Sequence, residues 1–116
     1  MKNYKNLKVW QKGMDIVTDV YQLASQLPAD EKFGLKSQVT RAAVSIPSNI
    51  AEGSAKTSKK DYRNYLEISL ASAFEIETQV LIIERLNFGE KNLRDKLLAS
   101  IDEEQKMLMS FIRTIE

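Results

Sequence analysis

Apolar residues recur along the chain at alternating steps of three and four positions, the spacing that places side chains on one face of an α-helix. Four segments show this pattern, and short connections separate them. The first covers residues 7–26. Its two apolar stripes consist of Trp10, Met14, Val17, Tyr21 and Ala24, and of Ile16, Val20, Leu23 and Leu27. We expect Asn6 to cap this helix and Pro28 to end it, because the residue before a proline avoids the helical conformation.

The second predicted helix covers residues 30–55 and contains an internal proline. Asp30 is expected to cap its start. Its apolar stripe consists of Leu35, Val39, Ala42, Ile46 and Ile50. Pro47 removes one backbone donor and crowds the carbonyl group of Ala43, which costs about 3 kcal/mol in an ordinary helix interior. Either a kinked helix continues to about residue 55 or the helix breaks and a short one follows; the unbroken phase of the stripe favours the kink.

Two longer helices complete the pattern. Ser58 is expected to cap the third, and Asp61 suits the positive end of its dipole. The buried stripe of the third helix is predicted to be Tyr62, Leu66, Ser69, Ala73, Ile76, Val80 and Ile83, widened by Leu70, Phe74 and Leu81. Gly89 can adopt the left-handed conformation in the turn at residues 87–89. The fourth helix runs from about residue 91, and Glu104 interrupts its stripe of Leu93, Leu97, Ile101, Leu108, Phe111, Ile112 and Ile115.

Together these segments predict an all-α fold, an up-down-up-down bundle of four helices with helix 2 kinked at Pro47. Neighbouring helices should be antiparallel because the connections are short. A length of 116 residues suits one domain, residues 1–116. Two prolines and four glycines are too few for the many turns of a β-sandwich or barrel. Trp10, Tyr21 and Phe74 occupy stripe positions, so we expect all three in the core.

The composition excludes several kinds of chemistry. The sequence contains no cysteine and no histidine. It therefore lacks a thiolate nucleophile, the commonest general base and the commonest transition-metal ligand. A bundle-type di-metal site needs Glu-x-x-His motifs, so we expect no enzymatic activity, no metal and no cofactor. No secretory signal and no apolar run of membrane-spanning length is present, which predicts a cytoplasmic protein that does not bind membranes.

Positive charge is unevenly distributed, although the formal net charge is only +1. The first twelve residues contain four lysines and no acid, and a second basic cluster surrounds position 60. In an up-down bundle both clusters lie at the same end. The candidate nucleic-acid-binding residues there are Lys8, Lys12, Lys56, Lys59, Lys60 and Arg63. They would contact phosphates, with Tyr4 and Tyr62 beside them for bases; alternatively, the lysines only solubilise two mobile segments.

The segment at residues 41–53 is the most unusual part of the chain. A polar stripe runs beside its apolar one and consists of Gln38, Arg41, Ser45, Asn49 and Glu52. Small residues next to this stripe would let another backbone approach closely. Either this helix packs on two sides, against its own core and against another subunit, or the stripe is a solvated face whose hydroxyl groups bond carbonyls freed by Pro47. Spacing alone favours neither.

Four motifs carry a resemblance to a known family. They are the run RAAVSIPSNIAEG at residues 41–53, Gly34-Leu35-x-x-Gln38 before it, Leu7-x-Val9-Trp10-Gln11, and Ser72-x-x-Glu75-x-x-Thr78-Gln79. Spread over nearly the whole chain, they resemble the four-helix-bundle proteins encoded by intervening sequences within bacterial large-subunit ribosomal RNA genes. Ala71 departs from the pattern, since the family usually has glycine before Ser72; this affects only a local helix contact.

The resemblance implies a ring-forming homo-oligomer, commonly a pentamer. It also implies that the motif's polar positions contact either a neighbouring subunit or a partner; these are Gln38, Arg41, Ser45, Asn49, Glu52 and Glu75. A related branch of the family works with a reverse transcriptase and nucleic acid in diversity-generating retroelements. Two functions follow as hypotheses: a non-enzymatic oligomer that binds structured RNA or a nucleic-acid–protein complex, and a protein-interaction scaffold without direct nucleic-acid binding. Neither requires a small-molecule substrate.

Overall fold

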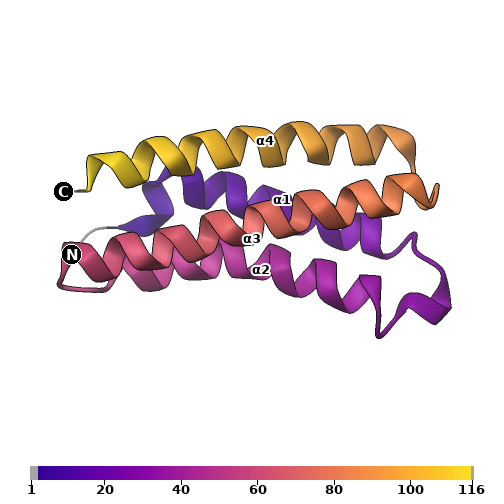
Figure 1. Ribbon diagram of the computed structural model, residues 1–116, viewed down its shortest axis with the longest axis horizontal. Coiled ribbons are helices and arrows are strands. Elements are labelled where there is room, and N and C mark those ends of the chain that lie inside the picture. Colours follow the sequence, from indigo (N-terminus) through magenta and orange to yellow (C-terminus); the bar gives the residue numbers. More distant parts are fainter. Residues whose placement is uncertain (1–2, 116) are drawn as a thin grey trace.

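The computed structural model describes residues 3–115, which form four α-helices and two 3₁₀ helices. Their order is η1 (Tyr4–Asn6), α1 (Lys8–Ala24), η2 (Ala29–Glu31), α2 (Leu35–Ser54), α3 (Lys59–Arg85) and α4 (Lys91–Thr114) (Figure 1). No strand occurs within residues 3–115. The predicted all-α class and the four predicted helices are therefore confirmed.

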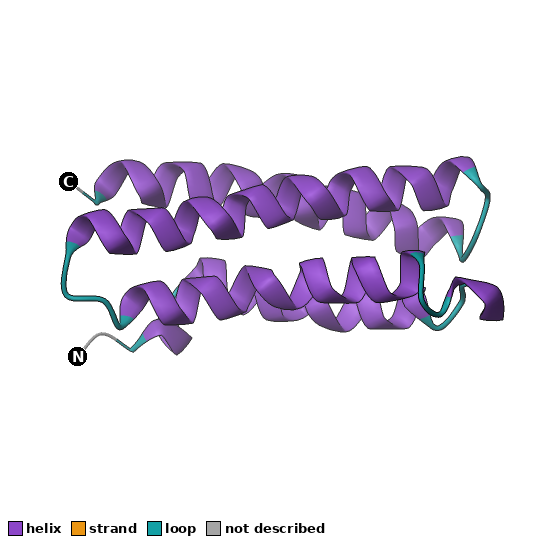
Figure 2. Cartoon of the chain, turned by 60° about the horizontal axis from the view of Figure 1, so that its bottom comes forward, coloured by secondary structure: helices purple, strands orange, loops and turns teal. Residues whose placement is uncertain are grey.

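Contacts between neighbouring helices join residues whose numbers run in opposite directions. Along α2 and α3 the pairs are Ser45–Ser72 and Gly53–Tyr62, and along α1 and α4 they are Lys12–Glu103 and Asp19–Lys96. Figure 1 accordingly shows each helix running back along the one before it. Figure 2 shows the consequence: the N-terminal segment and the α2–α3 connection lie at one end, and the other two connections lie at the opposite end.

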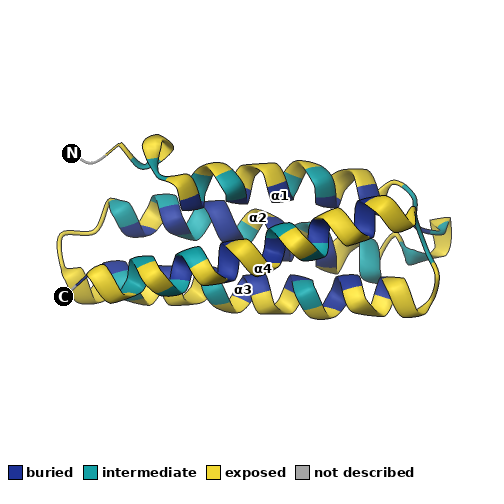
Figure 3. Ribbon diagram, turned by 90° about the horizontal axis from the view of Figure 1, so that it is seen from above, coloured by how far each residue is buried: buried dark blue, intermediate teal, exposed yellow. Residues whose placement is uncertain are grey.

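The core is built from the predicted apolar stripes. Residues without exposed surface include Ile16, Val20 and Leu23 of α1, Val39, Ile46 and Ile50 of α2, Leu66, Ile76, Val80 and Ile83 of α3, and Leu97, Ile101 and Leu108 of α4. Figure 3 shows them along the inner sides of the helices. Burying each such side chain contributes about 1.5–3 kcal/mol, so these stripes stabilise the bundle.

Two aromatic residues expected in the core lie at its edge instead. Tyr21 is 52% exposed and Phe74 is 46% exposed. Leu81, which was predicted to widen the buried stripe of the third helix, is 47% exposed. Helices α1 and α3 each carry two neighbouring apolar stripes, and only one can face the centre of the bundle. The other is left on the flank, where the tertiary arrangement rather than the spacing sets exposure. Trp10 packs against the core from a half-buried position and meets the Tyr4 ring edge-on at 5.4 Å.

Two predicted caps are wrong. Asn6 belongs to η1, and α1 follows Leu7 without a side-chain cap. Asp30 belongs to η2, and α2 begins later, where the Glu31 carboxylate accepts a hydrogen bond from the Leu35 amide at 3.2 Å. In both places the residue predicted to cap the α-helix is instead part of a 3₁₀ helix that precedes it. A cap preference marks a region near a helix start, and local turns decide the position.

The remaining boundary signals behave as predicted. The Ser58 hydroxyl accepts a hydrogen bond from the Asp61 amide at 3.0 Å and caps α3. Gly89 has a φ of 72° in the turn before α4. Helix α2 continues without interruption through Pro47, which excludes the broken alternative, whereas a bend of its axis there stays a prediction. The hydroxyl of Ser69 on α3 donates to the carbonyl of Ile46, beside the proline, at 2.9 Å.

Candidate functional site

The basic end of the molecule is the group of cationic residues around the start of α1 and the start of α3. Both segments lie at the same end, beside the C-terminal end of α4 (Figure 1). Lys5, Lys8, Lys59 and Lys60 are exposed there, and none of them forms an ion pair with another described residue. Four free ammonium groups therefore face solvent from two segments far apart in the sequence.

The other predicted cations of this end have partners within the chain. Lys12 lies 3.4 Å from the Glu103 carboxylate. The Arg63 guanidinium donates a hydrogen bond to the Ile115 carbonyl at 2.8 Å, which ties α3 to the end of α4. The Lys56 ammonium lies 5.0 Å from the centre of the Tyr65 ring. These three residues help to hold the end together. The unpaired positive charge comes from Lys5, Lys8, Lys59 and Lys60.

Tyr62 was predicted to offer its ring to a base at this end, and its position contradicts this. The side chain is 5% exposed, and its ring meets that of Phe111 edge-on at 5.9 Å. Burial raises the pKa of the Tyr62 hydroxyl. Tyr62 also lies against Gly53, so it closes the contact between α2 and α3. Its place in the apolar stripe was the better guide to its role than the lysines beside it.

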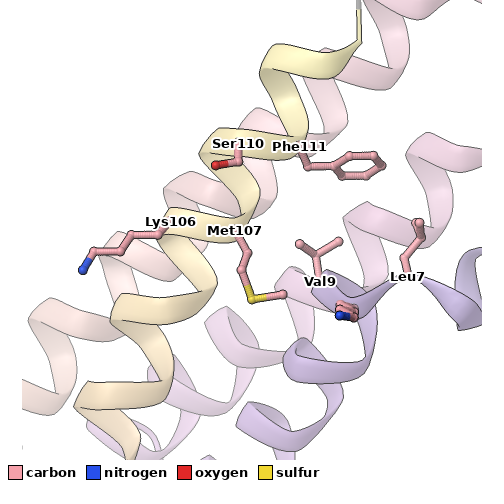
Figure 4. Close-up of a pocket in the computed structure, with 7 residues that line it drawn as sticks. Leu7, Val9, Lys106, Met107, Ser110 and Phe111 are labelled. Carbon is pink, nitrogen blue, oxygen red and sulfur yellow. The ribbon is translucent and has the colours of Figure 1, made fainter.

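An apolar hollow adjoins the basic end, between α1 and α4. It has a volume of about 400 Å³ and is lined by Leu7, Val9, Met107 and Phe111 (Figure 4), and also by Lys8. The sequence did not reveal it because the lining comes from helices whose contact only the fold creates. It places apolar surface directly beside the free lysines.

The predicted polar stripe divides into inner and outer parts. On the inner side, the hydroxyl groups of Ser45 and Ser72 lie 2.8 Å apart, and the Asn49 amide donates to both the carbonyl and the hydroxyl oxygen of Ser45 at 2.8 Å. These three side chains form a hydrogen-bonded cluster that joins α2 to α3. The outer members Gln38, Arg41 and Glu52 are exposed.

Glu75, the α3 member of the motif, is exposed as well. Its carboxylate accepts a hydrogen bond from the nearly buried Gln79 side chain at 3.2 Å. Gly53 allows the close approach of the two helices, because a Cβ atom there would lie 2.8 Å from the Cβ of Tyr65. The segment at residues 41–53 thus serves the α2–α3 contact with its inner residues, whereas the motif residues Gln38, Arg41, Glu52 and Glu75 are exposed.

The comparison with known families confirms the resemblance that the sequence motifs indicate. The model of the 23S rRNA-intervening sequence protein family matches residues 5–110. The chain belongs to this family. It is similar to a crystal structure of a protein of unknown function from the S23 ribosomal protein family of Bacteroides thetaiotaomicron, with 26% identity and a TM-score of 0.82, covering 90% of this chain and 95% of that chain. No curated protein matches the chain.

In this member of the 23S rRNA-intervening sequence family, α3 exposes large apolar side chains. Four of them are between 42% and 49% exposed: Ile68, Phe74, Leu81 and Ile82; Leu86, directly after the helix, is 49% exposed. The hollow between α3 and α4 adds apolar surface and is bounded by Phe74, Met109 and Ile112. Exposed apolar patches are typical of protein-contact sites. The sequence had assigned Phe74 and Leu81 to the core, so this surface was missed.

Glu104 is a further residue whose role the sequence did not reveal. Its side chain is fully buried, and neither carboxylate oxygen has a hydrogen-bond partner among the described residues. Gly13 leaves room for it, since a Cβ atom there would lie 3.2 Å from Oε2. Burial raises the pKa of Glu104 to about 8, which the nearby Lys12 partly opposes. The interrupted apolar stripe of the fourth helix was the only signal of this position.

Residues 3–115 contain neither a metal-binding cluster nor a membrane-spanning helix. No cluster of three or more acidic, histidine or cysteine side chains is suited to hold a metal ion. No helix in the same range is both long and apolar enough to cross a membrane.

Proposed function

We propose that this protein is a non-enzymatic, cytoplasmic, antiparallel up-down-up-down bundle that binds structured RNA through its basic end. One observation carries the proposal: Lys5 and Lys8 lie at the same end as Lys59 and Lys60, without ion pairs to other described residues. Unpaired ammonium groups release counterions when they meet phosphates, which drives binding. The positive end of the α3 dipole lies beside them and also attracts anions.

We further propose that copies of the chain associate, as a pentamer by family resemblance. The exposed apolar residues of α3 and the outward polar residues of α2 support this, because obligate contacts combine apolar and hydrogen-bonding surface. A ring would repeat the basic end several times on one surface. Several weak phosphate contacts would then act together on one RNA molecule.

The proposal is tested by fluorescence anisotropy with a labelled fragment of 23S ribosomal RNA at several salt concentrations. The variant carries Lys8→Gln, Lys59→Gln and Lys60→Gln. We expect its affinity to fall at least about tenfold, and the slope of log K against log salt to decrease by roughly 2 to 3, one increment for each lost phosphate contact. Circular dichroism should be unchanged, because all three side chains are exposed.

A matched control removes the same charge from the opposite end, with Arg85→Gln, Lys91→Gln and Lys96→Gln. Its net charge equals that of the basic-end variant, so general electrostatics would weaken both equally. If the two variants lose affinity to the same extent, or if the wild type fails to bind RNA at low salt, the basic end is not an RNA site.

The exposed apolar surface of α3 favours a second candidate function, a scaffold that contacts a protein partner. In that case RNA binding is absent, and the partner docks on the face that includes Phe74 and Ile82. Affinity purification of the wild type and of an Ile82→Asp variant, each treated with ribonuclease, separates the two functions. A partner retained after ribonuclease treatment and lost with Ile82→Asp supports the scaffold.

A further inference from the structure

A second candidate site lies at the end of the molecule opposite the basic end. There α1, the turn after η2 and the start of α2 enclose a pocket of about 470 Å³. Figure 1 shows η2 at this far end, away from the N-terminus. The volume falls within the range of small-ligand pockets, about 300–1,000 Å³. Two aromatic rings and two lysines contribute to the lining: Tyr21, Lys32, Phe33 and Lys36.

Both aromatic rings are left open to solvent. Phe33 is 87% exposed and Tyr21 is 52% exposed, although each has an apolar face that burial would stabilise. Phe33 is not part of the core cluster, and the Lys32 ammonium lies 5.4 Å from the centroid of its ring. A phenylalanine this exposed, in the lining of a pocket, offers a ring on which a planar group can stack.

Both charged side chains that line the pocket are lysines, and the acidic residues Asp30 and Glu31 lie beside it in η2. Neither Lys32 nor Lys36 forms an ion pair with another described residue. The neighbouring Glu31 carboxylate is engaged, because it accepts the hydrogen bond from the Leu35 amide at the start of α2. Asp30 lies in η2 and is not part of the pocket lining. The two lysines are therefore available to an anion that enters between α1 and α2.

We propose that this pocket binds an unpaired nucleotide of single-stranded RNA, its base on Phe33 and Tyr21 and its phosphate on Lys32 and Lys36. Aromatic rings stack on any base, and adjacent lysines hold the backbone, which is the combination that single-strand-binding surfaces use. An acidic peptide would satisfy the lysines but leave both rings uncovered. This inference relies on RNA as the partner of the protein, and it concerns a different site from the basic end.

The test uses the full chain and a short single-stranded oligoribonucleotide that contains 2-aminopurine, whose fluorescence falls when it stacks. We expect quenching with the wild type and about a tenfold weaker affinity with Phe33→Leu, which keeps an apolar side chain but removes the ring. Met14→Leu is the matched control, an exposed apolar residue of α1 that does not line this pocket, and should change nothing. With Lys32→Gln and Lys36→Gln together, the salt slope should decrease by roughly 1.4.

The outcomes separate this pocket from the basic end. If structured RNA binds but the short oligonucleotide is not quenched, or if Phe33→Leu behaves like Met14→Leu, the pocket proposal is wrong and the basic-end proposal stands. If quenching persists in the basic-end variant and is lost with Phe33→Leu, the pocket is an independent site. Equal competition by a polyglutamate peptide would show a general anion site and overturn the assignment to RNA.

Discussion

Glu104 places a carboxyl group in the middle of the bundle, where it has no hydrogen-bond partner among residues 3–115. A charged carboxylate is costly to bury, so the side chain retains its proton to a higher pH than usual. Burial of the carboxyl group therefore raises the pKa of Glu104 to about 8. Gly13 opposite leaves the space that the group occupies, and the nearest cation, Lys12, is engaged with Glu103 at the surface.

The folded protein should therefore lose stability as the pH rises. Because the folded pKa of Glu104 is raised, from 4.5 to about 8, the folded state binds its proton more tightly than the unfolded state. The resulting stabilisation is complete below about pH 4.5 and is lost progressively up to about pH 8. A shift of this size corresponds to at most about 5 kcal/mol.

Denaturant unfolding of the wild type and of Glu104→Gln between pH 5 and 9 measures this effect. We expect the free energy of unfolding of the wild type to fall over this interval, and that of Glu104→Gln to change much less, so that the variant becomes the more stable one near pH 9. Glu103→Gln, the exposed neighbour, should retain the wild-type slope. A wild-type stability that stays level from pH 6 to 9 would show that Glu104 titrates normally.

At the scale of elements, the contact between α2 and α3 depends on small side chains and hydroxyl groups. Ser45, Asn49 and Ser72 form hydrogen bonds across it, and Ser69 adds one to the Ile46 carbonyl. These groups bridge the helices near Pro47, where α2 lacks one backbone donor. The family motif is therefore explained in part by packing between α2 and α3 of the same chain, and its exposed residues are those free for another role.

Gly53→Ala tests how closely the two helices approach. The added Cβ would lie 2.8 Å from the Cβ of Tyr65 and 3.0 Å from Cδ1 of Tyr62, so the helices must separate. Overpacking of this kind costs about 1–3 kcal/mol, against a gain in helix propensity of up to about 1 kcal/mol. We expect a net loss, measured by thermal unfolding.

Glu52→Ala, in the same turn but exposed, is the matched control for that experiment. It changes no contact between α2 and α3, so its effect should stay within about 0.5 kcal/mol. An increase in melting temperature with Gly53→Ala would mean that the helices can separate freely, and that the glycine is not required by packing.

At the scale of the whole molecule, the apolar side chains of α3 should decide whether copies associate. Ile82 is 42% exposed on α3 and Met14 is 43% exposed on α1, so the pair matches in exposure but not in position. If the α3 surface lies between subunits, Ile82→Asp buries an unpaired charge there and lowers the mass of the assembly. Met14→Asp should leave it unchanged.

Light scattering on the purified proteins measures this directly. We expect a wild-type mass several times that of the chain, a smaller mass for Ile82→Asp, and the wild-type mass for Met14→Asp. A wild type that remains monomeric at every concentration would contradict the proposed association. Equal dissociation by both variants would point to a contact surface that is not specific to α3.

The amino-acid sequence by itself determined the helices, most of the core and the family. Spacing identifies the stripes of α2 and α3, because a helix with one face against a core must repeat apolar residues near every 3.6 positions. Short connections fixed which basic segments share an end. A thirteen-residue motif around Pro47 identified the family, since few other arrangements would keep a proline within an apolar helical stripe.

Only the tertiary structure decided which of two adjacent stripes faces inward and which polar groups find partners. In the packed bundle Tyr21, Phe74 and Leu81 lie at the surface, Glu104 is buried, and Lys12 and Arg63 have partners within the chain. It also created the pocket of Phe33 from two helices and a turn. The physical reason is the same throughout: spacing defines the face of a single helix, whereas burial and pairing depend on which neighbours the packed bundle brings against that face.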